Sequence, residues 1–254
     1  MPVRTTTETA TMREAGRVVA TTLQAVRAAA RPGVRLRELD EVAQTCLREA
    51  GALPSFLGYA PSWAPTPFNG VLCLSPNEVV VHGRPTGRRL ADGDLLSIDC
   101  GAVVDGWHGD SAITVHVGTP DGDDPRLLAA TEEALAAGIA AAVPGATLLD
   151  VARAVDGVAR SHGFTQLADH GGHGIGRSMH EAPFVPMAPV PGAEHVVLRP
   201  GNTLAIEPML HAGGSAYRTA KDGWSIVTRD RRRAAHVEHT VVVTDDGPVV
   251  LTAV

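Results

Sequence analysis

Residues 94–118 read DLLSIDCGAVVDGWHGDSAITVHVG, two runs rich in apolar and β-branched residues on either side of Asp105-Gly106. An Asp-Gly pair between such runs is typical of a hairpin with a two-residue turn. A turn of that length places Asp99 opposite Ala112, and Asp110 then lies two residues along on the same face. We therefore expect an antiparallel hairpin that carries two carboxylates on one side.

Helical patterns flank this hairpin on both sides. Apolar residues recur in them at the three- and four-residue spacing of an amphipathic helix. Thr11 and Glu14 have the spacing of a capping box and predict the start of the first helix, whereas Pro54–Pro67 is predicted to be a long loop. The four helical segments are 9–34, 36–52, 126–145 and 148–164.

The two helical pairs resemble each other. A shift of 112 residues superimposes Pro32-Gly33 on Pro144-Gly145, and a shift of 108 residues superimposes residues 92–99 on 200–207. Chance matching of Pro-Gly pairs and Ala-rich helices is the alternative explanation. A true repeat would place Asp99 and Glu207 at equivalent ends of equivalent strands.

The repeat predicts an α+β fold in a single catalytic domain, residues 1–254, with pseudo-repeats at roughly 11–118 and 124–251. Each half would contribute two helices and then strands. We expect a pseudo-two-fold antiparallel sheet that is covered on one face by four helices.

The composition is that of an ordinary globular protein, with 44% hydrophobic and 20% charged residues and a formal net charge of −6. This charge does not favour DNA or an anionic membrane surface as a partner. Cys46, Cys73 and Cys100 lack the spacing of a disulfide framework or a zinc site, and no apolar run approaches the ~18 residues of a membrane helix. We expect a cytoplasmic protein without DNA or membrane partners.

Carboxylates are expected to meet in one pocket of this fold. Glu238 lies among apolar and β-branched residues, where an unpaired carboxylate would be costly to bury. With Asp99, Asp110 and Glu207 it would give a charge of −4, which two divalent cations would neutralise. One histidine ligand would shift the metal preference towards Mn, Fe, Co or Zn.

Residues 171–183, GGHGIGRSMHEAP, supply two candidate histidines, His173 and His180, among glycines that permit a close backbone approach. The glycines could instead cradle a phosphate, but Pro183 and Pro186 argue against the helix that such a loop needs. His82 ends an apolar run in the first half. Taken singly, each histidine is also compatible with a structural role.

Five motifs occur in the order NEVVVHG (77–83), D-x(10)-D (99–110), GHGIGR-x-x-HE-x-P (172–183), IEPM (206–209) and EHT (238–240). Together they resemble the type I methionine aminopeptidases in their short bacterial form, metalloenzymes of the pita-bread fold. The similarity extends from about residue 11 to 251.

The resemblance implies a role for each matching residue. Five would be metal ligands for two divalent ions (Co, Mn, Fe or Zn), and two histidines, His82 and His180, would contact substrate. Trp224 would line the methionine pocket. The implied metal ligands are Asp99, Asp110, His173, Glu207 and Glu238, with Asp110 and Glu238 bridging both ions.

The departures from the family concern the substrate pocket. Met179 stands where an aromatic residue is usual, Phe68 where tyrosine is common, and Phe56 where a smaller residue is common. The loop from 58 to 70 looks longer than its family equivalent. The apolar pocket is expected to be lined by Phe68, Cys73, Met179 and Trp224.

The resemblance implies removal of the N-terminal methionine from nascent proteins and peptides when the second residue is small. Glu207 would move the proton during metal-assisted hydrolysis, while His82 and His180 stabilise the developing charge. We expect a monomer. The run Arg229–Arg233 is either a solvated turn or a contact to the ribosome.

Three alternatives remain open at this level. Another pita-bread aminopeptidase, such as a proline aminopeptidase, would share the five ligands but usually carries a large extra N-terminal domain. A non-catalytic binding protein on this scaffold would be expected to have lost ligands. A serine hydrolase using Ser111 or Ser215 would lack its usual nucleophile motif.

Overall fold

The predicted hairpin forms the core of the sheet in a computed structural model that describes residues 1–167 and 169–253. Its strands are β4 (Asp94–Val104) and β5 (Trp107–Val117). Asp99 pairs with Ala112, and Val104 pairs with Trp107 across the two-residue turn. The predicted register is therefore confirmed.

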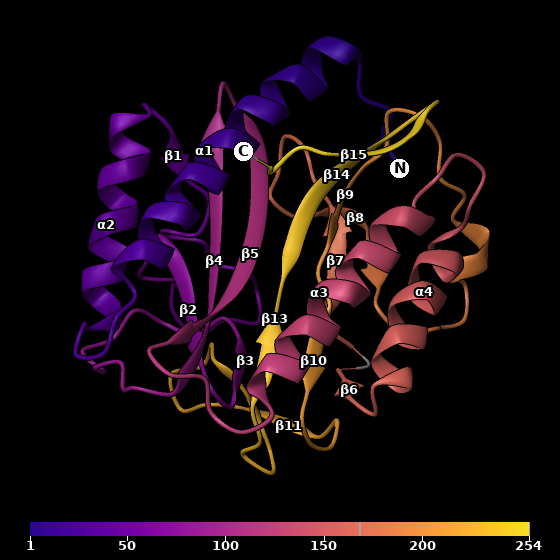
Figure 1. Ribbon diagram of the computed structural model, residues 1–254. Coiled ribbons are helices and arrows are strands. Elements are labelled where there is room, and N and C mark those ends of the chain that lie inside the picture. The colour runs from indigo at the N-terminus through magenta and orange to yellow at the C-terminus, as the bar shows by residue number, and fades with distance from the viewer. Residues whose placement is uncertain (168, 254) are drawn as a thin grey trace.

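The hairpin belongs to a nine-stranded antiparallel sheet (Figure 1). Its order is β1-β4-β5-β14-β9-β7-β8, with β2 paired to β4 and β15 paired to β14. The strands are β1 (Leu53–Pro54), β2 (Leu72–Pro76), β7 (Gly171–Gly174), β8 (Glu181–Pro186), β9 (Thr203–Ile206), β14 (Glu238–Thr244) and β15 (Gly247–Val250).

Two smaller sheets close one end of the molecule, in the orders β13-β10-β6 and β11-β12-β3. Their strands are β3 (Val79–Val81), β6 (Thr165–Gln166), β10 (Met209–His211), β11 (Tyr217–Thr219), β12 (Ile226–Thr228) and β13 (Ala234–His236).

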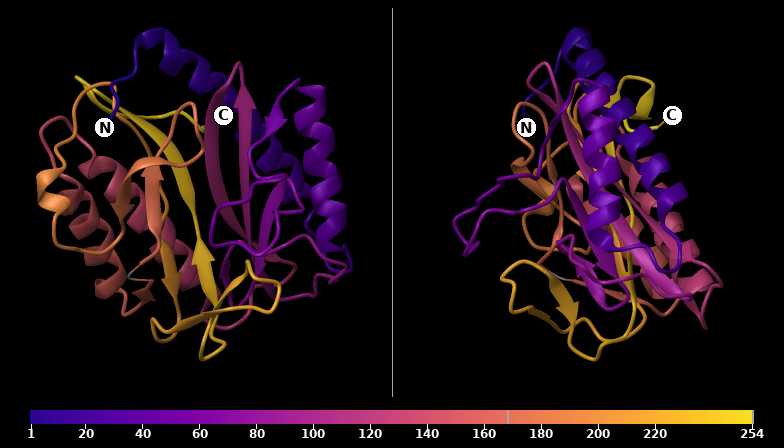
Figure 2. Two further views of the ribbon diagram at one scale, coloured as in Figure 1. Left: turned by 180° about the vertical axis from the view of Figure 1, so that it is seen from behind. Right: turned by 90° about the vertical axis from the view of Figure 1, so that its left-hand side faces the viewer.

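Four helices cover one face of the large sheet, as the sequence predicts (Figure 2). The first pair packs with the first-half strands around Leu39, Leu72 and Ile98, and the second pair packs with the second-half strands around Val151 and Leu204. The helices are α1 (Thr6–Ala29), α2 (Leu36–Glu49), α3 (Asp124–Ala141) and α4 (Leu148–Ser161), and a short 3-10 helix spans Ala193–His195.

The two halves of the chain meet in the middle of the sheet. Strand β14, from the end of the chain, lies between β5 of the first half and β9 of the second. Thr240 joins two of these strands, because its Oγ1 accepts from the N–H of Asp110 at 3.0 Å and donates to the same residue's carbonyl at 2.7 Å. The face opposite the helices is left free for a site.

Two expectations about element ends are wrong. Helix α1 begins five residues earlier than Thr11: Thr5 is its N-cap and forms a capping box with Glu8. The pairs Thr5/Glu8 and Thr11/Glu14 have the same spacing, and no helix-breaking residue lies between them. The earlier pair therefore caps the helix. Asp99 lies in the middle of β4, whereas Glu207 follows the end of β9, where Pro208 offers no N–H for continued pairing.

Within the described ranges, no helix is both long and apolar enough to cross a membrane.

Candidate metal centre and substrate pocket

Three carboxylates are brought together by the pairing of β4, β5 and β14. Ala112 of β5 pairs with Asp99 on one side and with Glu238 on the other. Cross-strand partners point to the same face, and Asp110 lies on that face two residues from Ala112. A small alanine between the two paired carboxylates leaves the space in front of it open.

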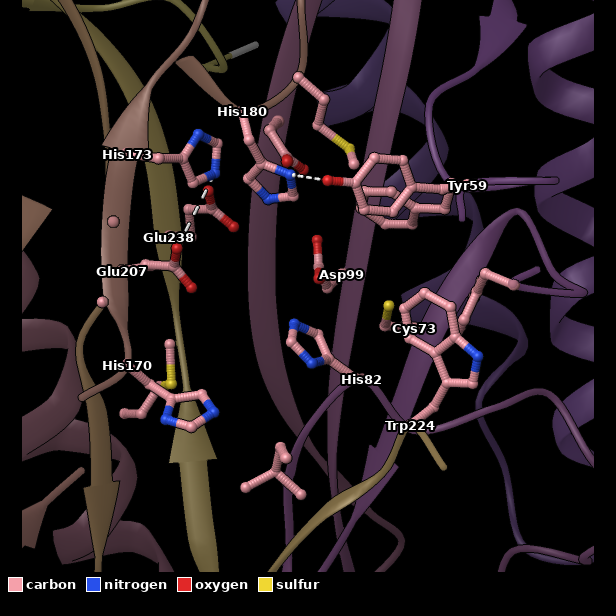
Figure 3. Close-up of a pocket in the computed structure, with 18 of the residues that line it drawn as sticks. Tyr59, Cys73, His82, Asp99, His170, His173, His180, Glu207, Trp224 and Glu238 are labelled. Atoms are coloured by element: carbon pink, nitrogen blue, oxygen red, sulfur yellow. Dashed lines mark hydrogen bonds and ion pairs between the residues drawn. The ribbon is translucent and has the colours of Figure 1, made fainter. Parts of the chain in front are cut away.

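The second half of the chain adds His173 and Glu207 to this face. His173 of β7 pairs with Ala205 of β9, and Glu207 follows two residues later. The Nδ1–H of His173 donates to the carbonyl of Gly174 at 2.9 Å, so its Nε2 lone pair is free, 3.9 Å from Glu207 Oε1. Figure 3 shows His173, Glu207 and Glu238 on one wall of the pocket, with Asp99 facing them.

Burial makes this cluster of acids costly to ionise. It raises the pKa of Asp99 to about 7 and that of Glu207 to about 8. Burial, and then the charges of neighbouring carboxylates, raise the pKa values of Asp110 and Glu238 well above their usual range. Like charges this close need a compensating positive charge.

The polar atoms of the cluster fit a divalent cation. Asp99 Oδ1, Asp110 Oδ1 and Glu238 Oε1 are buried and have no hydrogen-bond partner among the described residues. Burial lowers the pKa of His173 to about 3, which keeps the imidazole neutral and able to bind a metal. Two groups of residues each offer three possible ligand atoms, and within each group these atoms lie within 4.8 Å of one another. The groups are Asp110, His173 and Glu238, and Glu207, His236 and Glu238.

His236 is a member of this cluster that the sequence interpretation missed. Its side chain is 2% exposed, and its Nε2 lies 3.3 Å from Glu207 Oε2 and 3.9 Å from Glu238 Oε2. The backbone of His236 is fixed by Thr114, whose Oγ1 donates to its carbonyl at 2.7 Å. A signal existed: His236 stands two residues before Glu238, the spacing that puts neighbours on one face of a strand.

The two other predicted histidines face the same pocket (Figure 3). His180 stands against His173, with ring centroids 4.3 Å apart, and its Nδ1 is 2.9 Å from the hydroxyl of Tyr59. Burial lowers the pKa of His180, and it lowers that of His82 to about 3. Both side chains are therefore neutral at pH 7.

The predicted apolar residues form one cluster beside the carboxylates. Trp224 and Phe68 lie edge to face with centroids 5.0 Å apart, and Cys73 is the cross-strand partner of Asp99. Burial raises the pKa of the Cys73 thiol well above its usual range, so this wall carries no charge. The cluster consists of Phe56, Phe68, Cys73, Met179 and Trp224. Its buried side chains line part of a cavity of about 610 Å³.

The cavity has further lining residues that were not singled out from the sequence. Tyr59 and Trp63 come from the long loop after β1, and the rings of His170 and Tyr217, with centroids 5.0 Å apart, line another part of the cavity. Asp169 joins that part: its carboxylate accepts from the Tyr217 hydroxyl at 2.6 Å and lies 3.0 Å from His170 Nδ1. Local pattern does not mark these positions, because Tyr217 begins a strand of only three residues and the others lie outside helices and strands.

The arginine run Arg229–Arg233 forms the exposed turn between β12 and β13, as one of the two predictions stated. Arg231 Nη2 lies 3.5 Å from Glu78 Oε1. Arg233 is half-buried and forms ion pairs with Asp121 and Asp124.

Known proteins are similar to this chain in sequence and in overall structure. Methionine aminopeptidase 1 of Mycobacterium tuberculosis (strain CDC 1551 / Oshkosh) is 49% identical over 259 residues, which cover 99% of this chain and 95% of that protein. The crystal structure of methionine aminopeptidase from Thermotoga maritima, 37% identical, matches with a TM-score of 0.95 and 100% coverage of both chains. Prolidase from Pyrococcus furiosus is 22% identical, has a TM-score of 0.78 and shares the fold, with 99% of this chain and 65% of the prolidase covered.

These likenesses confirm the predicted pita-bread fold. The family model described as metallopeptidase family M24 matches residues 10–245. With that match over nearly its whole length, the chain belongs to metallopeptidase family M24.

Proposed function

We propose that this protein is a methionine aminopeptidase that removes the N-terminal methionine from nascent proteins and peptides when the second residue is small. One observation carries the proposal: the carboxylate and histidine cluster and a group of buried apolar side chains line the same cavity. An aminopeptidase needs this combination, because its first substrate side chain must be buried next to the hydrolytic centre. The names and whole-length identity of the relatives support the same activity.

Membership of a metallopeptidase family implies divalent metal ions. We propose two per chain, of Co, Mn, Fe or Zn, because the pocket combines four carboxylates with imidazole nitrogen. When bound, such ions polarise a carbonyl and lower the pKa of water. The residues that would hold them are Asp99, Asp110, His173, Glu207 and Glu238.

The proton is proposed to move through Glu207. Its Oε2 lies 3.3 Å from His236 Nε2, and its Oε1 lies 3.9 Å from His173 Nε2. We propose that His236 positions this carboxylate by donating a hydrogen bond. Glu207 can then accept a proton from the attacking water and return it to the leaving amine.

His180 and His82 are proposed to stabilise the tetrahedral species. Burial raises the pKa of Tyr59, so its hydroxyl stays protonated and can donate to His180 Nδ1. That tautomer places the proton of His180 on Nε2, where it can donate to a developing oxyanion. His82 faces the pocket from the other side.

His180→Ala is expected to lower kcat about a hundredfold while leaving the metal content unchanged, since a missing oxyanion donor typically costs that much. Steady-state kinetics and elemental analysis of the purified variant would test both statements. His195→Ala, a change at an exposed histidine away from the pocket, is the matched control and should behave as wild type. Stoichiometric loss of metal in His180→Ala would instead make His180 a metal ligand.

The peptides Met-Ala-Ser, Leu-Ala-Ser and Met-Leu-Ser would test the proposed specificity. Met-Ala-Ser is expected to have the highest kcat/KM, because thioether and aromatic rings suit each other in the pocket and bulk at the second residue is excluded. Leu in the first position is expected to be ~10-fold to ~200-fold worse, the range for apolar side chains of similar volume. Equal rates on all three would leave the runner-up, an M24 aminopeptidase with another first-residue specificity, which the departures at Met179 and Phe68 favour.

Three further expectations belong to this proposal. The ligands come from both pseudo-repeats, so we propose that residues 1–254 act as one catalytic unit. Nascent proteins as substrates would place the enzyme in the cytoplasm, where we propose that it acts as a monomer. Contact between the turn Arg229–Arg233 and the ribosome stays a prediction.

A further inference from the structure

In the loop between β1 and β2, two backbone hydrogen bonds join residues 58 and 59 to residue 68. The N–H of Gly58 donates to the carbonyl of Phe68 at 2.9 Å, and the N–H of Phe68 donates to the carbonyl of Tyr59 at 2.9 Å. Residues 60–67 therefore leave and return at the same point. Figure 2 shows the loop projecting from the face of the sheet opposite the helices.

The far side of this loop is docked on the turn that carries Trp224. The indole N–H of Trp224 donates to the carbonyl of Thr66 at 2.9 Å. Pro65 packs so closely on Gly223 that a Cβ there would lie 2.2 Å from the proline ring. A loop fixed at its base and at this second point presents Trp63 in a defined position.

Trp63 lines the mouth of the cavity and is nevertheless 57% exposed. Its ring lies edge to face against Trp224 with centroids 4.9 Å apart, and it lies nearly parallel to His82 with centroids 6.1 Å apart. It thus continues the wall of the apolar pocket outward. The exposed part of the indole is available for a further apolar contact beside the cavity.

The alternation of side chains in an extended peptide indicates what meets this surface. Side chains of residues one and three point to the same side, about 6.5–7 Å apart, while residue two points to the opposite wall. If residue one lies beside Phe68 and Trp224, residue three reaches the next ring along the same wall. Trp63 supplies that ring, since its centroid lies 4.9 Å from that of Trp224 on the side away from the buried cluster.

We propose that Trp63 is a binding subsite for an apolar or aromatic side chain at the third residue of the peptide substrate. The inference rests on the proposed aminopeptidase function and deepens it. Residue three lies beyond the scissile bond, so its contact with Trp63 is the same before and during reaction. Uniform binding of this kind lowers KM and leaves kcat unchanged.

The test compares Met-Ala-Phe, Met-Ala-Leu and Met-Ala-Gly peptides, blocked at the C-terminus, with wild type and three variants. In wild type, kcat/KM is expected to be about fivefold higher for Phe or Leu than for Gly at position three, through KM. Trp63→Ala should bring this ratio to within twofold of one, and Trp63→Phe should keep most of it. Leu57→Ala, which removes an exposed apolar side chain of the same segment outside the cavity lining, should keep the whole ratio.

A wild-type ratio near one, or a Trp63→Ala ratio equal to that of wild type, would overturn the subsite. A ratio lost equally in Leu57→Ala would also overturn it, since the effect would then belong to the whole segment. If the enzyme prefers another first residue, the proposed methionine specificity fails while the third-residue ratio is still measured on that residue. A panel in which no peptide is cleaved overturns both proposals.

Discussion

Glu207→Gln is expected to reduce kcat on Met-Ala-Ser by 10²- to 10⁴-fold, the usual contribution of a general base. The amide keeps the shape of the carboxylate and its contacts with His173 and His236, so the fold should be retained. It cannot accept the proton of the attacking water, and it removes one negative charge from the cluster. Single-turnover and steady-state rates, with metal content measured on the same sample, would give the size of the effect.

The control for this variant is Glu14→Gln, because Glu14 is exposed on α1 and forms its ion pair with Arg17. It should retain wild-type rates. A loss below about tenfold in Glu207→Gln with full metal content would contradict the proton-transfer role. A loss that disappears when excess metal is added would assign Glu207 to metal binding alone.

Local rules predicted the part of the site that lies on the hairpin. A two-residue turn fixes the register, and register fixes which side chains share a face, so Asp99 and Asp110 could be placed together from sequence. The same alternation relates His236, the last residue of β13, to Glu238, the first residue of β14, although it was not applied to these two residues. Where one short-range rule decided the geometry, the prediction was confirmed.

Element ends were less predictable, because competing signals of equal quality exist in the chain. Thr5 and Glu8 have the same spacing as Thr11 and Glu14, and only the absence of a breaker between them lets α1 begin early. The alignment of the pseudo-repeats matched the sequences around Asp99 and Glu207 but could not show that β4 continues into a hairpin.

The cavity walls could not be derived from local pattern at all. Phe68, Met179 and Trp224 are far apart in sequence and were brought together by resemblance to a family. Trp63 and His170 lie in irregular segments, where neither helical nor strand periodicity says which way a side chain points. Only the contacts of the folded chain reveal them.

Removal of the metal ions is expected to abolish activity and to lower the melting temperature by roughly 5–10 °C. A ligand present at about 100 times its Kd stabilises a folded protein by about 2.7 kcal/mol, and 1 kcal/mol corresponds to about 2–4 °C for a chain of this size. The physical source is the cluster of buried carboxylates, in which one oxygen each of Asp99, Asp110 and Glu238 has no hydrogen-bond partner among the described residues. Activity assays and differential scanning calorimetry after exhaustive chelation would measure both effects, with elemental analysis to verify metal removal. Added Mn²⁺ should restore the activity and the melting temperature.

The stability of the metal-free protein is expected to depend on pH through the buried carboxylates, which links the chelation experiment to these residues. Burial raises the pKa of Asp99 to about 7 and that of Glu207 to about 8, whereas both groups titrate near pH 4 in the unfolded chain. Between about pH 4 and about pH 8 the folded metal-free protein therefore holds more protons than the unfolded chain. Its free energy of unfolding must fall as the pH rises through this window.

Bound cations favour the ionised carboxylates and oppose this loss, so the difference in melting temperature between loaded and chelated protein should widen from about pH 5 to about pH 8. Glu238→Gln removes one of the repelling charges and should flatten the pH dependence of the chelated protein, whereas Glu14→Gln should leave it as in wild type. A metal-free protein that stays fully active would overturn the metallopeptidase mechanism. A difference in melting temperature that is constant with pH would instead place the metal away from these carboxylates, because their raised pKa values link metal binding to protons in this range.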